Sequence, residues 1–264
     1  MLQNYLLSTL HLFLFSLICL LTFSACEPKV DIQPLMELTI QDKRNIADGI
    51  FDLISANDNY EILDRNEYAD AYQHLDQYVT TITSSDLLTH RTAYKWTAHI
   101  INNEQGTNAF VTPGGYAYFD LGLLRKIDSE DAFMHLLAHT INYADKDIIN
   151  QKLQDNYGLQ LLLDLALDSN IETVEELLNT LYSLKYDLND VEASDDFMLE
   201  LACEKGYDAS LLRWFLLNNS DITWLDLHPT NSLDTRLNFI RDYQCTPTNQ
   251  QNITDSYQEF LGKL

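Results

Sequence analysis

Positive charge is scarce in this chain. There are 16 lysines and arginines against 40 aspartates and glutamates, which leaves a formal net charge of −24 at pH 7 with the histidines neutral. A surface of this sign repels the phosphate backbone, so the composition argues against nucleic-acid binding. Apolar residues still make up 46% of the chain and charged residues 21%, a mixture typical of a folded domain and unlike a disordered acidic tail.

Long hydrophobic runs are equally scarce. The only one extends from Tyr5 to Ala25 and contains no Asp, Glu, Lys or Arg. A single run excludes a polytopic membrane protein and leaves either a signal peptide or one uncleaved anchor. Internal repeats and low-complexity tracts are absent, and no linker divides the remainder. One domain over residues 35–264 is therefore the simplest organisation.

Cysteine is rare, and one of the four cysteines follows the hydrophobic run directly. The segment Phe23-Ser24-Ala25-Cys26 resembles a bacterial lipobox, in which small residues precede a cysteine that is lipidated and becomes the new amino terminus. We therefore expect a lipoprotein signal peptide over residues 1–25, then lipidated Cys26 and a short linker over residues 26–34. An uncleaved anchor is the alternative.

Lipidation of Cys26 would tether the domain to a membrane without spanning it. The expected location is the bacterial cell envelope, with the domain facing the periplasm or the exterior. In such an oxidising compartment Cys203 and Cys245 either form a disulfide or remain two separate buried thiols, and the sequence leaves both alternatives open.

Hydrophobic periodicity predicts a mostly helical α+β domain with a small sheet. Helices are expected at residues 35–55, 66–83, from Ser129 through His139, and at 159–167, 171–184, 191–205, 210–217 and near Gln258. Strands are expected at residues 94–101, 108–111 and 116–120. Four of the eight glycines fall between Gly106 and Gly122, so Pro113-Gly114-Gly115 predicts a sharp turn between the last two strands.

Several short motifs occur in a specific order. They are Asn108-Ala109-Phe110-Val111-Thr112-Pro113-Gly114-Gly115-Tyr116, then Gly122-Leu123-Leu124, Leu137-Ala138-His139, Leu199-Glu200, Gly206-Tyr207-Asp208, and His228-Pro229 followed by Arg236. This order resembles the zinc metallopeptidase family that includes the CAAX prenyl proteases, the heat-shock protease HtpX and the periplasmic chaperone-protease BepA. The resemblance covers residues 94–241 and implies a gluzincin fold, with the small sheet packed on the motif helix.

The chemistry of that family depends on an HExxH motif. Two histidines one helical turn apart hold zinc, and the intervening glutamate takes a proton from the metal-bound water. The corresponding residues here are His139-Thr140-Ile141-Asn142-Tyr143, so Thr140 replaces the base and Tyr143 replaces the second histidine. A threonine hydroxyl is no general base near neutral pH. We therefore expect no catalytic residue and no cofactor.

The third metal ligand of the family is a glutamate four residues before an aspartate. Counting back from Gly206 makes Asp195 that aspartate and places Val191 at the ligand position. Glu192 and Asp190 lie one residue to either side, and a slip of one residue turns a helical side chain by about 100°. Either carboxylate would need a local shift to reach a metal.

An active enzyme remains the alternative prediction. His135 and His139 are also one turn apart, and together with Glu192 or Asp190 they would form the atypical site of a zinc-dependent metalloendopeptidase. No base is evident, because Leu136 occupies the place of the glutamate. His135 is otherwise a semi-buried helical histidine, and His228 is either a further donor or a turn residue before Pro229.

Peptide binding is the family activity that these substitutions leave intact. In the family the strand before and through the PGG turn offers an exposed edge, which binds an extended substrate by main-chain hydrogen bonds. The corresponding residues are Asn108, Phe110, Pro113, Gly114, Gly115 and Tyr116. We therefore predict a lipid-anchored pseudo-peptidase in envelope protein quality control that binds an extended peptide or scaffolds another envelope protein. The remaining possibility is a purely structural lipoprotein in which the cleft has closed.

Overall fold

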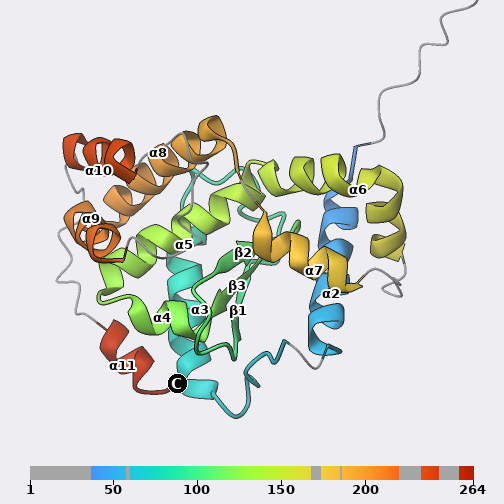
Figure 1. Cartoon of the computed structure of the whole chain (residues 1–264), viewed down its shortest axis with the longest axis horizontal. Helices are drawn as coiled ribbons and strands as arrows, with labels where there is room; N and C mark the ends of the chain where they lie inside the picture. The colour runs from blue at the N-terminus through green and yellow to red at the C-terminus, as the bar shows by residue number, and fades with distance from the viewer. Residues whose placement is uncertain (1–36, 58–59, 168–173, 185, 220–232, 244–255) are drawn as a thin grey trace, which may run out of the picture. The chain divides into compact units, whose positions relative to one another are not determined.

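The computed structural model describes residues 37–57, 60–167, 174–184, 186–219, 233–243 and 256–264. Residues 38–264 form one compact unit, which is mostly helical around a small sheet (Figure 1). The expected α+β class is thus confirmed. The predicted signal peptide, linker and lipidated Cys26, together with His228 and Cys245, lie outside the described residues. Among the described residues no helix is long and apolar enough to cross a membrane.

The sheet has three strands and mixed direction. They are β1 (Thr97–Ile101), β2 (Ala109–Val111) and β3 (Tyr116–Asp120), in the spatial order β1-β3-β2. The central strand β3 is parallel to β1 and antiparallel to β2. The β2–β3 turn requires glycine, since Gly114 has φ 84° and a Cβ there would lie 2.5 Å from the Lys43 carbonyl oxygen.

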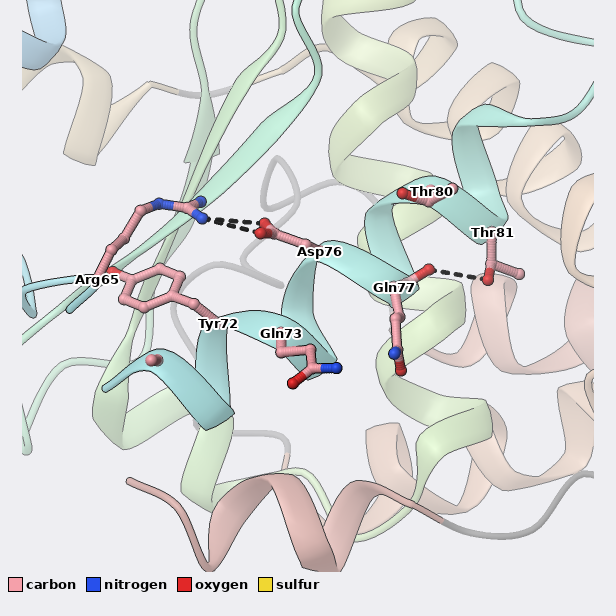
Figure 2. A pocket seen from close by; sticks show the side chains of 8 residues that line it. Arg65, Tyr72, Gln73, Asp76, Gln77, Thr80 and Thr81 are labelled. Atoms are coloured by element: carbon pink, nitrogen blue, oxygen red, sulfur yellow. Dashed lines mark hydrogen bonds and ion pairs between the residues drawn. The ribbon is translucent and has the colours of Figure 1, made fainter. Parts of the chain in front are cut away.

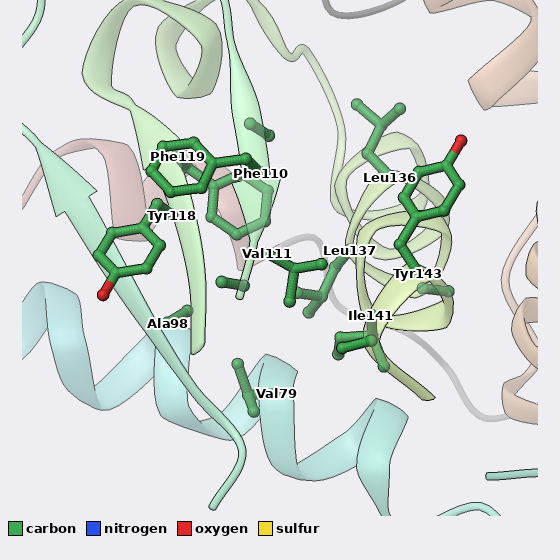
Figure 3. Close-up of a cluster of buried hydrophobic side chains, with 14 of the residues drawn as sticks. Val79, Ala98, Phe110, Val111, Tyr118, Phe119, Leu136, Leu137, Ile141 and Tyr143 are labelled. Atoms are coloured by element: carbon green, nitrogen blue, oxygen red, sulfur yellow. The ribbon is translucent and has the colours of Figure 1, made fainter. Parts of the chain in front are cut away.

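One face of the sheet packs on the motif helix. This helix, α5 (Glu130–Asp145), begins at Ser129, whose side chain accepts a hydrogen bond from the Ala132 N–H. Leu137 and Ile141 of α5 lie beside Val111 of the sheet (Figure 3). Nearly every side chain of α5 is buried, so the helix runs through the core.

Two earlier helices complete this core. Helix α2 (Ile40–Ser55) begins with a capping box between Thr39 and Asp42, and α3 (Ala69–Thr83) packs against β1 and α5. The short helix α4 (Leu121–Lys126) links β3 to α5. Together these elements hold β3 and α5 in fixed positions.

The later helices surround α5. They are α6 (Ile148–Leu167), α7 (Val174–Ser183), α8 (Leu188–Lys205), α9 (Ala209–Asn218), α10 (Leu233–Asp242) and α11 (Tyr257–Leu261). Helix α8 packs against α5, and α9 packs against both α5 and α10. The α8 and α5 helices run antiparallel, because Asp131 near the start of α5 binds the N–H of Asp208 just beyond α8.

Some predicted boundaries were wrong. The strand expected from residue 94 begins at Thr97, and α8 begins before Val191 because the Asp187 side chain caps the N–H of Asp190. The first half of α6, α4 and α10 were not predicted. Helix α6 is interrupted by the non-helical Gly158, so its two halves show no shared hydrophobic stripe.

Candidate functional site

Three side chains from three helices meet beside the motif position. The His139 Nδ1 atom on α5 lies 3.2 Å from an Asp195 carboxylate oxygen on α8. The same carboxylate accepts two hydrogen bonds from Arg236 on α10, at 2.6 Å from Nε and 2.5 Å from Nη2. All three residues are buried. The structure therefore brings together the histidine, the aspartate and the arginine that the sequence motifs single out.

The protonation states of this triad follow from its contacts. Burial alone would raise the pKa of Asp195, but the Arg236 charge and the hydrogen bonds from His139 and Arg236 hold the pKa at about 2. Burial lowers the pKa of His139, against the opposing effect of Asp195. A neutral imidazole facing a carboxylate donates from Nδ1, which leaves the lone pair on Nε2 as an acceptor.

The Tyr143 hydroxyl donates a hydrogen bond to this Nε2 atom. The hydroxyl oxygen lies 2.9 Å from His139 Nε2, so the phenol donates to the lone pair that a metal would need. Burial raises the pKa of Tyr143 well above its usual range, so the phenol keeps its proton. Its ring stacks on Tyr186 with 3.7 Å between centroids and 5° between planes. The two tyrosines fill the space one turn after His139, and this donor set does not fit zinc.

Thr140 and His135 have purely local partners. The Thr140 hydroxyl donates to the Leu136 carbonyl oxygen of its own helix at 2.9 Å, so it is directed away from His139 Nε2. The His135 Nδ1 atom donates to the Asp131 carbonyl oxygen at 2.6 Å, and burial lowers the pKa of His135 to about 4. His135 is therefore a neutral core residue.

The alternative metal ligands point elsewhere. Glu192 is exposed on the outer side of α8, whereas His139 is buried. Asp190 pairs with Lys152 at 3.2 Å, and Val191, which the resemblance places at the third-ligand position, is buried. Across the described ranges no three His, Cys, Asp or Glu side chains form a metal-binding group. The structure does not bring together the atypical set of His135, His139 and Glu192.

The expected exposed edge is buried. Residues 109–120, which include Phe110, Pro113, Gly114, Gly115 and Tyr116, all lie in the interior. Strand β3 is central, so its main-chain groups are already paired on both sides. The outer side of β2 is covered by α7. The Asn108 side chain donates to the Tyr182 carbonyl oxygen at 2.8 Å, and the Phe110 and Tyr182 rings lie 5.0 Å apart. The prediction of an exposed edge here was wrong.

The opposite edge of the sheet is also closed. Arg65 donates to the β1 carbonyl oxygen of Ala98 at 2.7 Å, and the Tyr72 hydroxyl accepts the Ile100 N–H at 3.2 Å. Arg65 also binds both Asp76 carboxylate oxygens, at 3.1 and 3.0 Å, along an open polar groove on α3 (Figure 2). These side chains form hydrogen bonds with main-chain groups at the edge of β1, and they so prevent that edge from pairing with another chain.

Sequence reasoning missed the tyrosine cover and one further groove. Tyr186 precedes α8 outside any motif, so no local signal marks it. A cavity of about 580 Å³ opens between α8 and α10, with Glu192 and Phe239 in its walls. The helical spacing of acidic residues on α8 is the one signal that points to it.

No family model matches the chain, and no curated protein matches it. Function is therefore inferred from its own residues.

Proposed function

We propose that the chain is a proteolytically inactive member of the zinc metallopeptidase family that it resembles, with a gluzincin-type domain. In this proposal it binds or scaffolds another protein of the bacterial cell envelope. The observation that carries the proposal is the hydrogen bond between His139 Nε2 and the Tyr143 hydroxyl. This bond joins His139, the retained first ligand of the family motif, to Tyr143, which stands in place of the second histidine.

Three substitutions act together against hydrolysis. A catalytic zinc site has three protein ligands and an open position for water. Here a protonated phenol stands in place of the second imidazole, and the apolar Val191 stands in place of the glutamate. Thr140 supplies no base. The frame around His139 nevertheless persists, since Asp195 orients its ring as a carboxylate orients a metal-bound histidine.

Restoring the missing residues tests the proposal. The contact between Asn142 and Ser194, 2.8 Å apart, also joins α5 to α8, next to the pair of His139 with Asp195. Because the helices are antiparallel, Val191 lies near Tyr143. The triple variant Thr140→Glu, Tyr143→His, Val191→Glu should therefore bind one zinc ion, whereas the wild type should bind none.

The single variant Tyr143→His is the control, because it adds an imidazole without the other two groups. Zinc content after dialysis and titration against a chromophoric chelator measure the difference. Stoichiometric zinc in the wild type, with proteolysis that a chelator abolishes, would establish the active metalloendopeptidase instead. A triple variant that folds and binds no zinc would contradict the family assignment.

The envelope location rests on Cys26. In membrane fractions of a bacterial host the wild type should sediment with membranes, and Cys26→Ser should appear in the soluble fraction. The intact mass of the wild type should exceed that of the mature polypeptide by the attached lipid. Membrane retention of Cys26→Ser without lipid would indicate an uncleaved anchor.

The burial of β2 favours a second candidate, a structural lipoprotein with a closed cleft. Its main support is the cover formed by Tyr182 over Asn108 and Phe110. Crosslinking of extended peptides to β2 distinguishes the two candidates. Peptide capture that increases in Tyr182→Ala supports binding at a covered edge, and no capture in either protein supports the structural role.

A further inference from the structure

The groove between α8 and α10 has two distinct walls. On α8, Glu192 and Asp196 line the groove one turn apart, and both are exposed. Glu200 follows one turn further on, beyond the residues that line the cavity, and is also exposed. On α10, Thr235 and Phe239 line the opposite wall of the same cavity of about 580 Å³. We call this the acidic groove. Its lining also includes Val191, Asp195 and Arg236, so the groove adjoins the buried cluster of His139, Asp195 and Arg236.

The α10 wall continues as an aromatic row. Phe239 is 40% exposed, and Tyr243 follows it by one turn. Burial raises the pKa of Tyr243, and the nearby charges of Glu200 and Asp196 raise it further. Tyr243 therefore lies within electrostatic range of these two carboxylates. The groove itself combines the exposed Phe239 ring with the carboxylates of Glu192 and Asp196.

The acidic wall lacks internal neutralisation. Among the described residues no lysine or arginine forms an ion pair with Glu192 or Asp196. Arg236 also lines the cavity, but it forms an ion pair with the buried Asp195. Like charges one turn apart repel each other on a helix, so a cation placed between them relieves that repulsion.

We propose that the acidic groove binds a basic segment of a partner protein through lysine or arginine side chains. The aliphatic stem of such a side chain packs on Phe239, and its cationic head reaches Glu192 and Asp196. The net charge of −24 favours a basic partner and disfavours both a second copy of this chain and an anionic membrane. The proposal rests on the proposed function only in that the protein acts by binding.

The probe is a fluorescently labelled amphipathic peptide, with lysines one helical turn apart among leucines and alanines. Its anisotropy is measured with the mature chain, and we expect saturable binding that weakens as salt is added. The double variant Glu192→Gln with Asp196→Asn should bind about tenfold more weakly. Phe239→Ala should also weaken binding, with the salt dependence unchanged.

The matched control is the double variant Glu67→Gln with Asp155→Asn, which changes the net charge equally at exposed residues elsewhere. We expect its affinity to stay within about twofold of the wild type. Circular dichroism verifies that all variants fold.

Four results would overturn the proposal. They are no binding by the wild type, equal weakening in the control, equal binding of a peptide with glutamate in place of lysine, and a dimer in sedimentation that Phe239→Ala dissociates. The last would make the groove a contact between copies. None of them bears on zinc binding by the Thr140, Tyr143 and Val191 triple variant, so the two proposals fail separately.

Discussion

At the scale of single residues, Tyr143 determines whether His139 on the motif helix can bind a metal. An imidazole held by Asp195 has one free lone pair, and in this chain a phenol takes it. The Tyr143 hydroxyl therefore makes a satisfied hydrogen bond with His139 in the core. Asp195 and Arg236 then form a buried ion pair that ties α8 to α10 beside His139.

Tyr143→Phe should destabilise the protein by about 1–3 kcal/mol, because it leaves His139 Nε2 buried without a donor. Tyr186→Phe is the matched control, since it removes a hydroxyl from the stacked partner ring and keeps the ring itself. Urea unfolding followed by far-ultraviolet circular dichroism measures both. Equal losses in the two variants would show that the hydroxyl of Tyr143 has no special role.

Buried histidines make the stability depend on pH. Burial, together with the smaller effect of the positive charges of Arg65 and Lys95, lowers the pKa of His99 to about 3. Its ring lies 5.2 Å from Tyr118 and 4.8 Å from Phe51. The unfolded chain therefore binds more protons at this residue, so its contribution to stability is lost as pH falls from about 6.5 toward 3.

His99→Phe should reduce this dependence. Each such histidine contributes about 1.4 kcal/mol of stability loss per pH unit below 6.5, and the phenyl ring removes one of them. Urea unfolding at pH 7 and pH 5 gives the slope. An unchanged slope in the variant would mean that His99 is charged in the folded protein.

At the scale of elements, local signals predicted the hairpin and the motif helix well. The PGG turn sets β2 against β3, and Ser129 begins α5, because both depend on residues next to each other in sequence. Counting along α8 singled out Asp195, but its contact with His139 on α5 was not predicted. The cover of β2 by α7 and the Tyr186 stack were not predicted either, since neither has a local motif and both arise from tertiary packing.

A substitution at Gly114 tests whether the β2–β3 turn requires glycine. Gly114→Ala should cost more than about 1 kcal/mol, because it combines φ 84° with a Cβ position 2.5 Å from the Lys43 carbonyl oxygen. Gly158→Ala is the control, since its φ is 77° but no atom lies within 4 Å of the added Cβ. Equal unfolding midpoints in the two variants would show that the contact with Lys43 adds no strain.

At the scale of the whole molecule, the disulfide bears on the proposed compartment and the net charge bears on the proposed partner. Cys203 is disulfide-bonded. Such bonds persist in oxidising compartments, which supports the expected location. The net charge of −24 would keep copies apart and leave the acidic groove available to a basic partner.

Reduction should therefore lower the stability of the mature protein by about 2–4 kcal/mol. Unfolding with and without a reductant measures the change, and peptide mapping without reduction identifies the cysteine joined to Cys203. A Cys203→Ser variant should unfold as the reduced wild type does. Identical wild-type curves in the two conditions would contradict a stabilising disulfide.

The central proposal is that Tyr143, Thr140 and Val191 replace the second histidine, the base and the third ligand of the family that the chain resembles. One zinc titration of the wild type and the variant Thr140→Glu, Tyr143→His, Val191→Glu, side by side at neutral pH, tests it most directly. The account predicts no stoichiometric binding by the wild type and one zinc ion per chain in the variant. One tightly bound zinc ion in the wild type would contradict it.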